Sequence, residues 1–166
     1  KVSYNSTNSE SWTNAQAIAA GDLIIIATLT QSSRTLSGIT DPLGNDYTAS
    51  FSNRLYTNKN LGIRWTRSSG DIAAGSTFSA SFSGGSFKGI VMQSVSGAAA
   101  SGTLDLAGTG NDGASGASTY TDASAHNNAA AIGFGAVAII DGENSGFLHD
   151  ARFSNVYASD VGGIGK

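Results

Sequence analysis

Histidine, serine and carboxylate side chains are the groups of this chain that could carry out nucleophilic or acid–base chemistry. The only histidines are His126, beside Asn127 and Asn128, and His149, which precedes Asp150. Because serines are abundant, either histidine could belong to a Ser-His-Asp relay. The sequence has no Gly-x-Ser-x-Gly motif, however, and such a motif forms the strained turn that exposes a nucleophilic serine. We therefore expect no catalytic residue of this kind.

Paired carboxylates, the groups that hydrolyse glycosidic bonds, are also scarce. Glu10 and Glu143 are the only glutamates, and both occur in stretches rich in Asn, Ser and Gly that predict loops. Lectin-like hydrolases carry their acids on a strand in the order Glu-x-Asp-x-x-Glu, and this sequence lacks that pattern. Two carboxyl groups facing each other across a cleft are not expected. The sequence therefore predicts a protein that is not an enzyme.

Oxygen ligands suitable for calcium occur in two stretches, Asn111-Asp112 and Asp141-Gly142-Glu143-Asn144. Hard oxygen donors are the ligands that Ca²⁺ prefers, so Asp112, Asp141 and Glu143 are candidate metal ligands. Neither stretch has the Asp-x-Asp-x-Asp-Gly spacing of an EF-hand. Turns require the same residue types. We favour the turn interpretation and expect no cofactor.

Aromatic side chains could form a platform on which sugar rings stack. Trp12 and Tyr120 lie outside the clear strand patterns, which makes them the candidate carbohydrate contacts. Trp65 alternates with Leu61 and Ile63, and this spacing puts the three on the apolar face of a strand. Trp65 is therefore predicted to lie in the core, and Arg64 between them is predicted to point to solvent.

The charge balance of the chain excludes several classes of partner. Nine Lys and Arg against twelve Asp and Glu give a net charge of −3. The densest basic stretch, residues 54–67, has too few cations to neutralise a run of phosphates, so no nucleic acid is expected. No apolar run approaches the roughly 20 residues of a membrane helix, so no membrane insertion is expected. The absence of cysteine excludes disulfides.

Short strands are the elements that would position these residues. The chain has 166 residues, of which 40% are hydrophobic and 13% charged, and it fits a single domain over residues 1–166. Runs of β-branched and aromatic residues recur between turn-forming residues, while helical periodicity is nearly absent. The best helix candidate is residues 14–20. We predict an all-β fold, an antiparallel two-sheet sandwich of jelly-roll or Greek-key type with about 8–10 strands. The longer expected strands are residues 22–30, 47–52, 61–66, 77–83, 89–96 and 129–140; the shorter ones are residues 2–5, 104–106, 119–121 and 152–157.

Three stretches resemble a β-sandwich module of secreted bacterial proteins and phage structural proteins. They are Gly21-Asp22-Leu23, the turn from Ile39 to Thr48, and the strand from Ile90 to Gly97. The turn is similar to the module's Asp-x-x-Gly-Asn-x-Tyr-Thr pattern. The resemblance implies a jelly-roll or immunoglobulin-like sandwich that ends in an aromatic-rich strand. No such strand follows Tyr157, so it either lies outside this sequence or comes from a neighbouring subunit.

The low charge, the many small residues and the phage side of this resemblance suggest a structural or assembly protein. Examples are a capsid decoration, head-fibre or tail protein of a phage virion, or a subunit of a surface filament. Its partners would be copies of itself or other assembly proteins, on a virion or at an extracellular surface. The alternative is a carbohydrate-binding or adhesion module of a secreted bacterial protein, with a polysaccharide as its partner.

Overall fold

The computed structural model describes residues 2–4, 7–31, 34–48, 54–56, 59–84 and 87–98. These ranges contain eight strands and no helix, which confirms the all-β prediction. The strands are β1 (Val2–Tyr4), β2 (Ser9–Thr13), β3 (Leu23–Gln31), β4 (Leu36–Thr40), β5 (Arg54–Tyr56), β6 (Lys59–Arg67), β7 (Thr77–Phe82) and β8 (Phe87–Val95).

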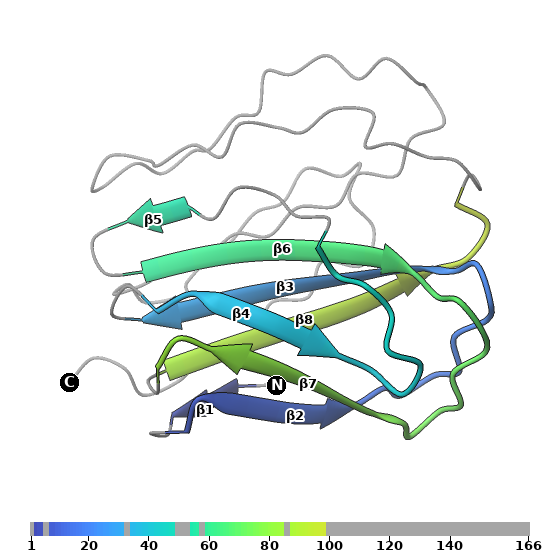
Figure 1. Cartoon of the computed structure of the whole chain (residues 1–166), viewed down its shortest axis with the longest axis horizontal. Helices are drawn as coiled ribbons and strands as arrows, with labels where there is room; N and C mark the ends of the chain where they lie inside the picture. Colours follow the sequence, from blue (N-terminus) through green and yellow to red (C-terminus); the bar gives the residue numbers. More distant parts are fainter. Residues whose placement is uncertain are drawn as a thin grey trace, which may run out of the picture.

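The strands form two antiparallel sheets that pack as a sandwich (Figure 1). The larger sheet has the order β1-β8-β3-β6-β5, and the smaller sheet has the order β2-β7-β4. The pairs β1–β8, β2–β7 and β3–β6 are nested, since each joins an early strand to a late one. This nested pairing is the arrangement of a jelly roll.

A paired connection carries the chain from the smaller sheet to the larger one. The segment after β2 lies antiparallel to the segment after β6, and Ile18 and Ile72 exchange two backbone hydrogen bonds of 2.9 and 2.8 Å. Gly21 N–H donates to the Ser68 carbonyl at 2.8 Å. The ladder of β2 and β7 therefore continues through the turn into the ladder of β3 and β6.

Strand β5 departs from the nested order. A full jelly roll would pair β5 with β4, but β5 instead forms a hairpin with β6, with Tyr56 opposite Lys59. Among the described residues, β4 is consequently an edge strand of the smaller sheet.

The hydrophobic core lies between the two sheets. Ile24 and Ile26 of β3 face Phe78 and Ala80 of β7, and all four side chains have an exposed fraction of 0%. The alternation expected in residues 77–83 is confirmed, because Phe82 is also buried and the intervening side chains of β7 are not. Burial of each large apolar side chain contributes about 1.5–3 kcal/mol to folding.

The best helix candidate, residues 14–20, does not form a helix. Asn14 donates from Nδ2 to the carbonyls of Gln16 (2.7 Å) and Ala73 (2.9 Å), and its N–H donates to the Ser76 carbonyl at 3.1 Å. The backbone of this segment is therefore hydrogen-bonded to residues 68–76 rather than to its own preceding turn. The residues form a connection between sheets, despite their alanine content.

Candidate functional site

A row of polar side chains crosses the inner face of the larger sheet at the end where β8 begins. Thr30 of β3 lies opposite Lys88 of β8 on one side and Asn60 of β6 on the other. The exposed fractions of Lys88, Thr30 and Asn60 are 1%, 1% and 3%. The side chains share one face because residues opposite each other in a sheet point the same way.

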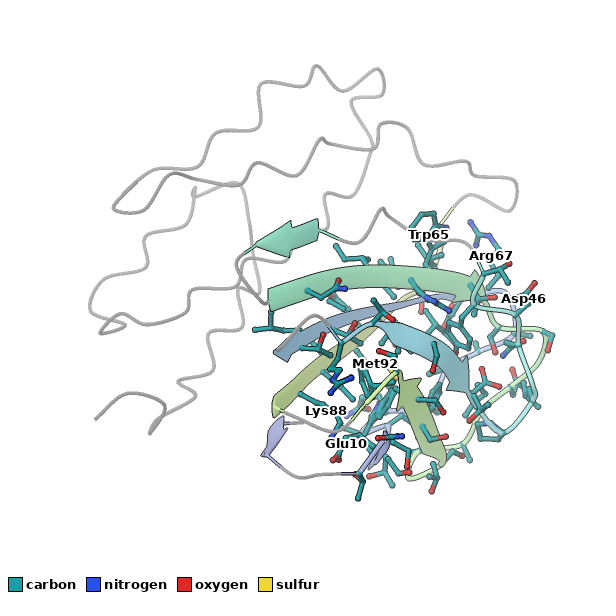
Figure 2. All side chains as sticks on the ribbon, turned by 60° about the vertical axis from the view of Figure 1, so that its left-hand side comes forward. Glu10, Asp46, Trp65, Arg67, Lys88 and Met92 are labelled. Carbon is teal, nitrogen blue, oxygen red and sulfur yellow. The ribbon has the colours of Figure 1, made fainter. Side chains whose placement is uncertain are left out.

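Glu10 of β2 reaches this row from the facing sheet. Its Oε1 lies 4.0 Å from Lys88 Nζ, and the Lys88 ammonium lies 5.9 Å from the centre of the Phe82 ring (Figure 2). The loop prediction for Glu10 is wrong, since Glu10 is a buried strand residue with an exposed fraction of 7%. The ion pair joins the two sheets across the core.

The buried pair does not have the access that an active site needs. The Lys88 side chain is 0% exposed, so a substrate cannot reach the amine in this conformation. Asn60 Nδ2 has no hydrogen-bond partner among the described residues. We interpret the row as an internal polar cluster that orients the sheets.

The turn after β4 is held by one carboxylate. Asp41 Oδ1 accepts hydrogen bonds from the backbone N–H groups of Leu43 (2.9 Å) and Asn45 (3.2 Å). Asp41 Oδ2 accepts from Asn45 Nδ2 and from the Tyr47 hydroxyl, both at 2.8 Å. Gly44 has a φ of 66°, a conformation that favours glycine.

The electrostatics of this turn follow from its burial and its donors. Burial alone would raise the pKa of Asp41, but the hydrogen bonds from Asn45, Tyr47 and Leu43 lower it below the ordinary value. Burial raises the pKa of Tyr47 strongly, and its bond to the Asp41 carboxylate raises it further. All the Asp41 bonds given above stay within the turn, so the motif that carries the resemblance stabilises the loop after β4.

The outer faces of the two sheets differ sharply in polarity. The outer face of the smaller sheet carries only Ser and Thr side chains along its three strands: Ser9, Ser11, Thr13, Ser37, Thr40, Thr77, Ser79 and Ser81. The outer face of the larger sheet is mostly apolar. Its described side chains are Leu23, Ile25, Ala27, Leu29, Ile63, Trp65, Arg67, Val91, Gln93 and Val95. We call this set the outer apolar face.

The outer apolar face is partly accessible. Val91 has an exposed fraction of 44%, whereas Ile25 and Ala27 of the central strand are buried at 7% and 5%. Figure 2 shows Trp65 on the side of β6 that points away from β4 and β7. Trp65 is thus half-buried on the outer face, and the prediction that it lies in the sandwich core is wrong.

The prediction that Arg64 points to solvent from the outer side of its strand is also wrong. It lies opposite Ile26 of β3 on the inner face, and its Nη2 donates to the Leu36 carbonyl of β4 at 2.9 Å. The alternation of β6 was interpreted correctly, but its apolar side faces outward rather than into the sandwich. Period-two patterns do not say which face is the core when both faces of a sheet carry apolar residues.

The aromatic candidate Trp12 is half-buried between the sheets. Its ring stacks on Phe78 with a centroid distance of 5.9 Å, and its Nε1 donates to Met92 Sδ at 3.4 Å. A sugar contact through Trp12 would therefore have to use the part of the indole that these two residues leave uncovered. The remaining candidates lie outside the described residues: Asp112, Asp141, Glu143, Tyr120, His126 and His149.

The sequence reasoning missed Lys88 and Asn60. Lys88 is spaced two and four residues before Ile90 and Met92, and this spacing puts all three on one face of β8. The alternation could thus have placed Lys88 in the core. Asn60 carries no comparable signal, because its inner-face neighbours on β6 are Gly62, Arg64 and Thr66.

Within the described ranges, no group of three or more His, Asp or Glu side chains is placed to hold a metal ion. No helix in those ranges has the length and apolar character needed to cross a membrane. Comparisons of the chain with models of known protein families, with curated proteins and with solved structures gave no match.

Proposed function

We propose that this protein is a non-enzymatic structural or assembly protein that packs against another protein subunit through the outer apolar face. The class that fits best is a virion accessory protein of a phage, such as a capsid decoration, head-fibre or tail component, or a subunit of a surface filament. Its location would be a virion or an extracellular surface, and its partners would be copies of itself or other assembly proteins.

The contrast between the two outer faces supports this proposal. An antiparallel sheet that meets water usually carries polar residues on its outer side, as the smaller sheet does. An apolar face that includes an exposed Val91 and a half-buried Trp65 is typical of a surface that another layer covers. Such packing requires shape and apolar area, and it needs no catalytic group.

The experiment compares one charge on each outer face. Val91→Asp puts a carboxylate on the outer apolar face, and Ser81→Asp puts the same group at an exposed position of the smaller sheet. We expect light scattering and negative-stain imaging to show an assembly for the wild-type protein and for Ser81→Asp. Val91→Asp should dissociate it to monomers that remain folded. A monomeric wild-type protein would overturn self-association through the outer apolar face.

Trp65 favours one alternative, a carbohydrate-binding or adhesion module of a secreted bacterial protein. An indole on an outer sheet face, in the same cross-strand row as the exposed Gln93 with Ile25 between them, could stack on a sugar ring while the amide binds its hydroxyls. In this case the wild-type protein would be a monomer that binds a polysaccharide on a glycan array. Trp65→Ala would abolish that binding, whereas Trp12→Phe would not.

A further inference from the structure

Strand β4 has the properties of a strand that could pair with another chain. It is an edge strand among the described residues, and its sequence Leu36-Ser-Gly-Ile-Thr40 contains no charge and no proline. Exposed strand edges present unpaired backbone groups that a second strand can use. Charged side chains and proline are the usual means by which proteins prevent such pairing, and β4 itself has neither.

The Leu36 carbonyl belongs to the open side of β4. Thr35 faces β7, because its carbonyl accepts from Ser83 N–H at 2.9 Å and its own N–H donates to Ser83 Oγ at 3.0 Å. Carbonyls of successive residues in a strand point in opposite directions. The Leu36 carbonyl therefore points away from β7, toward the side where an added strand would lie.

Arg64 donates a hydrogen bond to the Leu36 carbonyl from the opposite sheet. It starts on the inner face of β6, opposite the fully buried Ile26, and reaches across the open side of the sandwich to Leu36. Inward-pointing charged residues are one known device that protects sheet edges. A guanidinium suits this role because it stays charged and its donors are held in a fixed plane.

A β-bulge reinforces the protection at the same point. Leu36 lies opposite Phe82 and Gly38 lies opposite Ser81, so Ser37 is an extra residue in β4. A bulge bends its strand and disrupts the regular spacing of the edge groups. The bulge and the Arg64 contact thus coincide at the first two residues of β4.

We propose that Arg64 is a gatekeeper that prevents β4 from pairing with β4 of a second copy of this chain. The second copy is the partner to exclude, since an uncharged strand offers no charge repulsion against itself in an antiparallel pair. Arg64 would thereby restrict association to the outer apolar face, on the other side of the larger sheet. The gatekeeper role does not depend on the proposed function, because a monomeric protein would need the same protection; only the restriction to the outer apolar face rests on it.

The test replaces Arg64 with Met, which keeps an unbranched apolar stem and removes the charge and donors. The control variant Met92→Ala weakens the inner row next to Ile26 without touching the Leu36 carbonyl. All variants carry Val91→Asp as well, so that association through the outer apolar face does not contribute to the mass.

The particle mass of each variant is measured by light scattering on folded protein, well below the unfolding temperature. We expect Arg64→Met to at least double the particle mass, while Met92→Ala keeps the mass of the parent. Adding Ser37→Lys, an exposed charge on the β4 edge, should return Arg64→Met to that parent mass. An unchanged mass for Arg64→Met would overturn the proposal. Equal aggregation of Arg64→Met and Met92→Ala would also overturn it, because loss of stability would then be the cause.

Discussion

The hydroxyl of Tyr47 donates a hydrogen bond of 2.8 Å to the carboxylate of Asp41, six residues earlier in the chain. Tyr47 is 3% exposed and belongs to the hydrophobic core, while Asp41 organises a surface turn. The bond therefore connects the surface turn after β4 to the interior of the sandwich. It also couples two titrating groups whose pKa values move in opposite directions.

Removing the Tyr47 hydroxyl should lower stability at neutral pH. Tyr47→Phe keeps the buried ring and deletes the donor to a charged acceptor, which costs about 1.5–3 kcal/mol of unfolding free energy. Chemical denaturation followed by tryptophan fluorescence measures the loss. Thr48→Val is the control, because the Thr48 hydroxyl also bonds a carboxylate, that of Asp46 at 3.0 Å, but on an exposed side chain. A loss equal to that of Thr48→Val would contradict a coupling between turn and core.

The same residue predicts an alkaline limit of stability. The folded pKa of Tyr47 is raised above its ordinary value of 10.0, first by burial and then by Asp41. Its stabilising contribution is complete below pH 10.0 and is lost as the pH rises above that value toward the folded pKa. One such group can lower the unfolding free energy by up to about 1.4 kcal/mol per pH unit. Denaturation is measured at a series of pH values between neutral and strongly alkaline. The unfolding free energy should fall more steeply with rising pH in the wild type than in Tyr47→Phe.

Asp41 predicts the opposite dependence in acid. Its folded pKa lies below the ordinary value of 3.8 because its hydrogen bonds outweigh the effect of burial. The contribution is present above pH 3.8 and is lost as the pH falls below it through the folded pKa. Asp41→Asn should lower the unfolding free energy by about 2 kcal/mol at neutral pH, since an amide nitrogen cannot accept these hydrogen bonds. The variant should also lose less stability than the wild type between neutral pH and pH 2–3. If both proteins lost stability in parallel, Asp41 would not be the titrating group.

These residues show what the sequence could and could not predict. The strands β3, β6, β7 and β8 were predictable because apolar residues recur in them with strand spacing. Strands β2 and β4 were not, since Ser9–Thr13 and Leu36–Thr40 consist largely of Ser, Thr and Gly, which turns also favour. Their strand state depends on pairing with β7, a contact between residues far apart in the chain.

The candidate site was harder to predict than the fold. Glu10 lies in a polar stretch of the sequence, which gives no sign of burial. Its burial follows from the position of β2 over the polar row of Lys88, Thr30 and Asn60. The orientation of Arg64 depends on which side of β6 faces the other sheet, and alternation alone leaves that choice open. The Asp41 turn was recognisable in type from its residues, but its bond to the core Tyr47 required the fold.

The ion pair between Glu10 and Lys88 predicts a large effect for the loss of one partner. Lys88→Met fills a similar volume but leaves the Glu10 carboxylate in the core without the ammonium, which costs about 3–5 kcal/mol. The double variant Lys88→Met with Glu10→Gln should recover at least half of that loss, because neither of the two positions then carries a charge. Urea denaturation of the two variants and of Glu10→Gln completes a double-mutant cycle. A cost below about 1 kcal/mol for Lys88→Met would indicate that water reaches the pair.

Asn60 predicts a gain of stability. Its Nδ2 is buried and has no hydrogen-bond partner among the described residues, and an unmet buried donor costs about 1–3 kcal/mol. Asn60→Val removes the donor and introduces a β-branched residue that suits a strand next to Thr30. We expect the unfolding free energy to rise by about 1 kcal/mol in urea denaturation. Asn60→Ala is the control: it removes the same donor but leaves a cavity, and its stability should fall below that of Asn60→Val. A loss of stability in Asn60→Val would mean that the Asn60 amide binds an internal water molecule. The polar row of Lys88, Thr30 and Asn60 would then be a hydrated cluster.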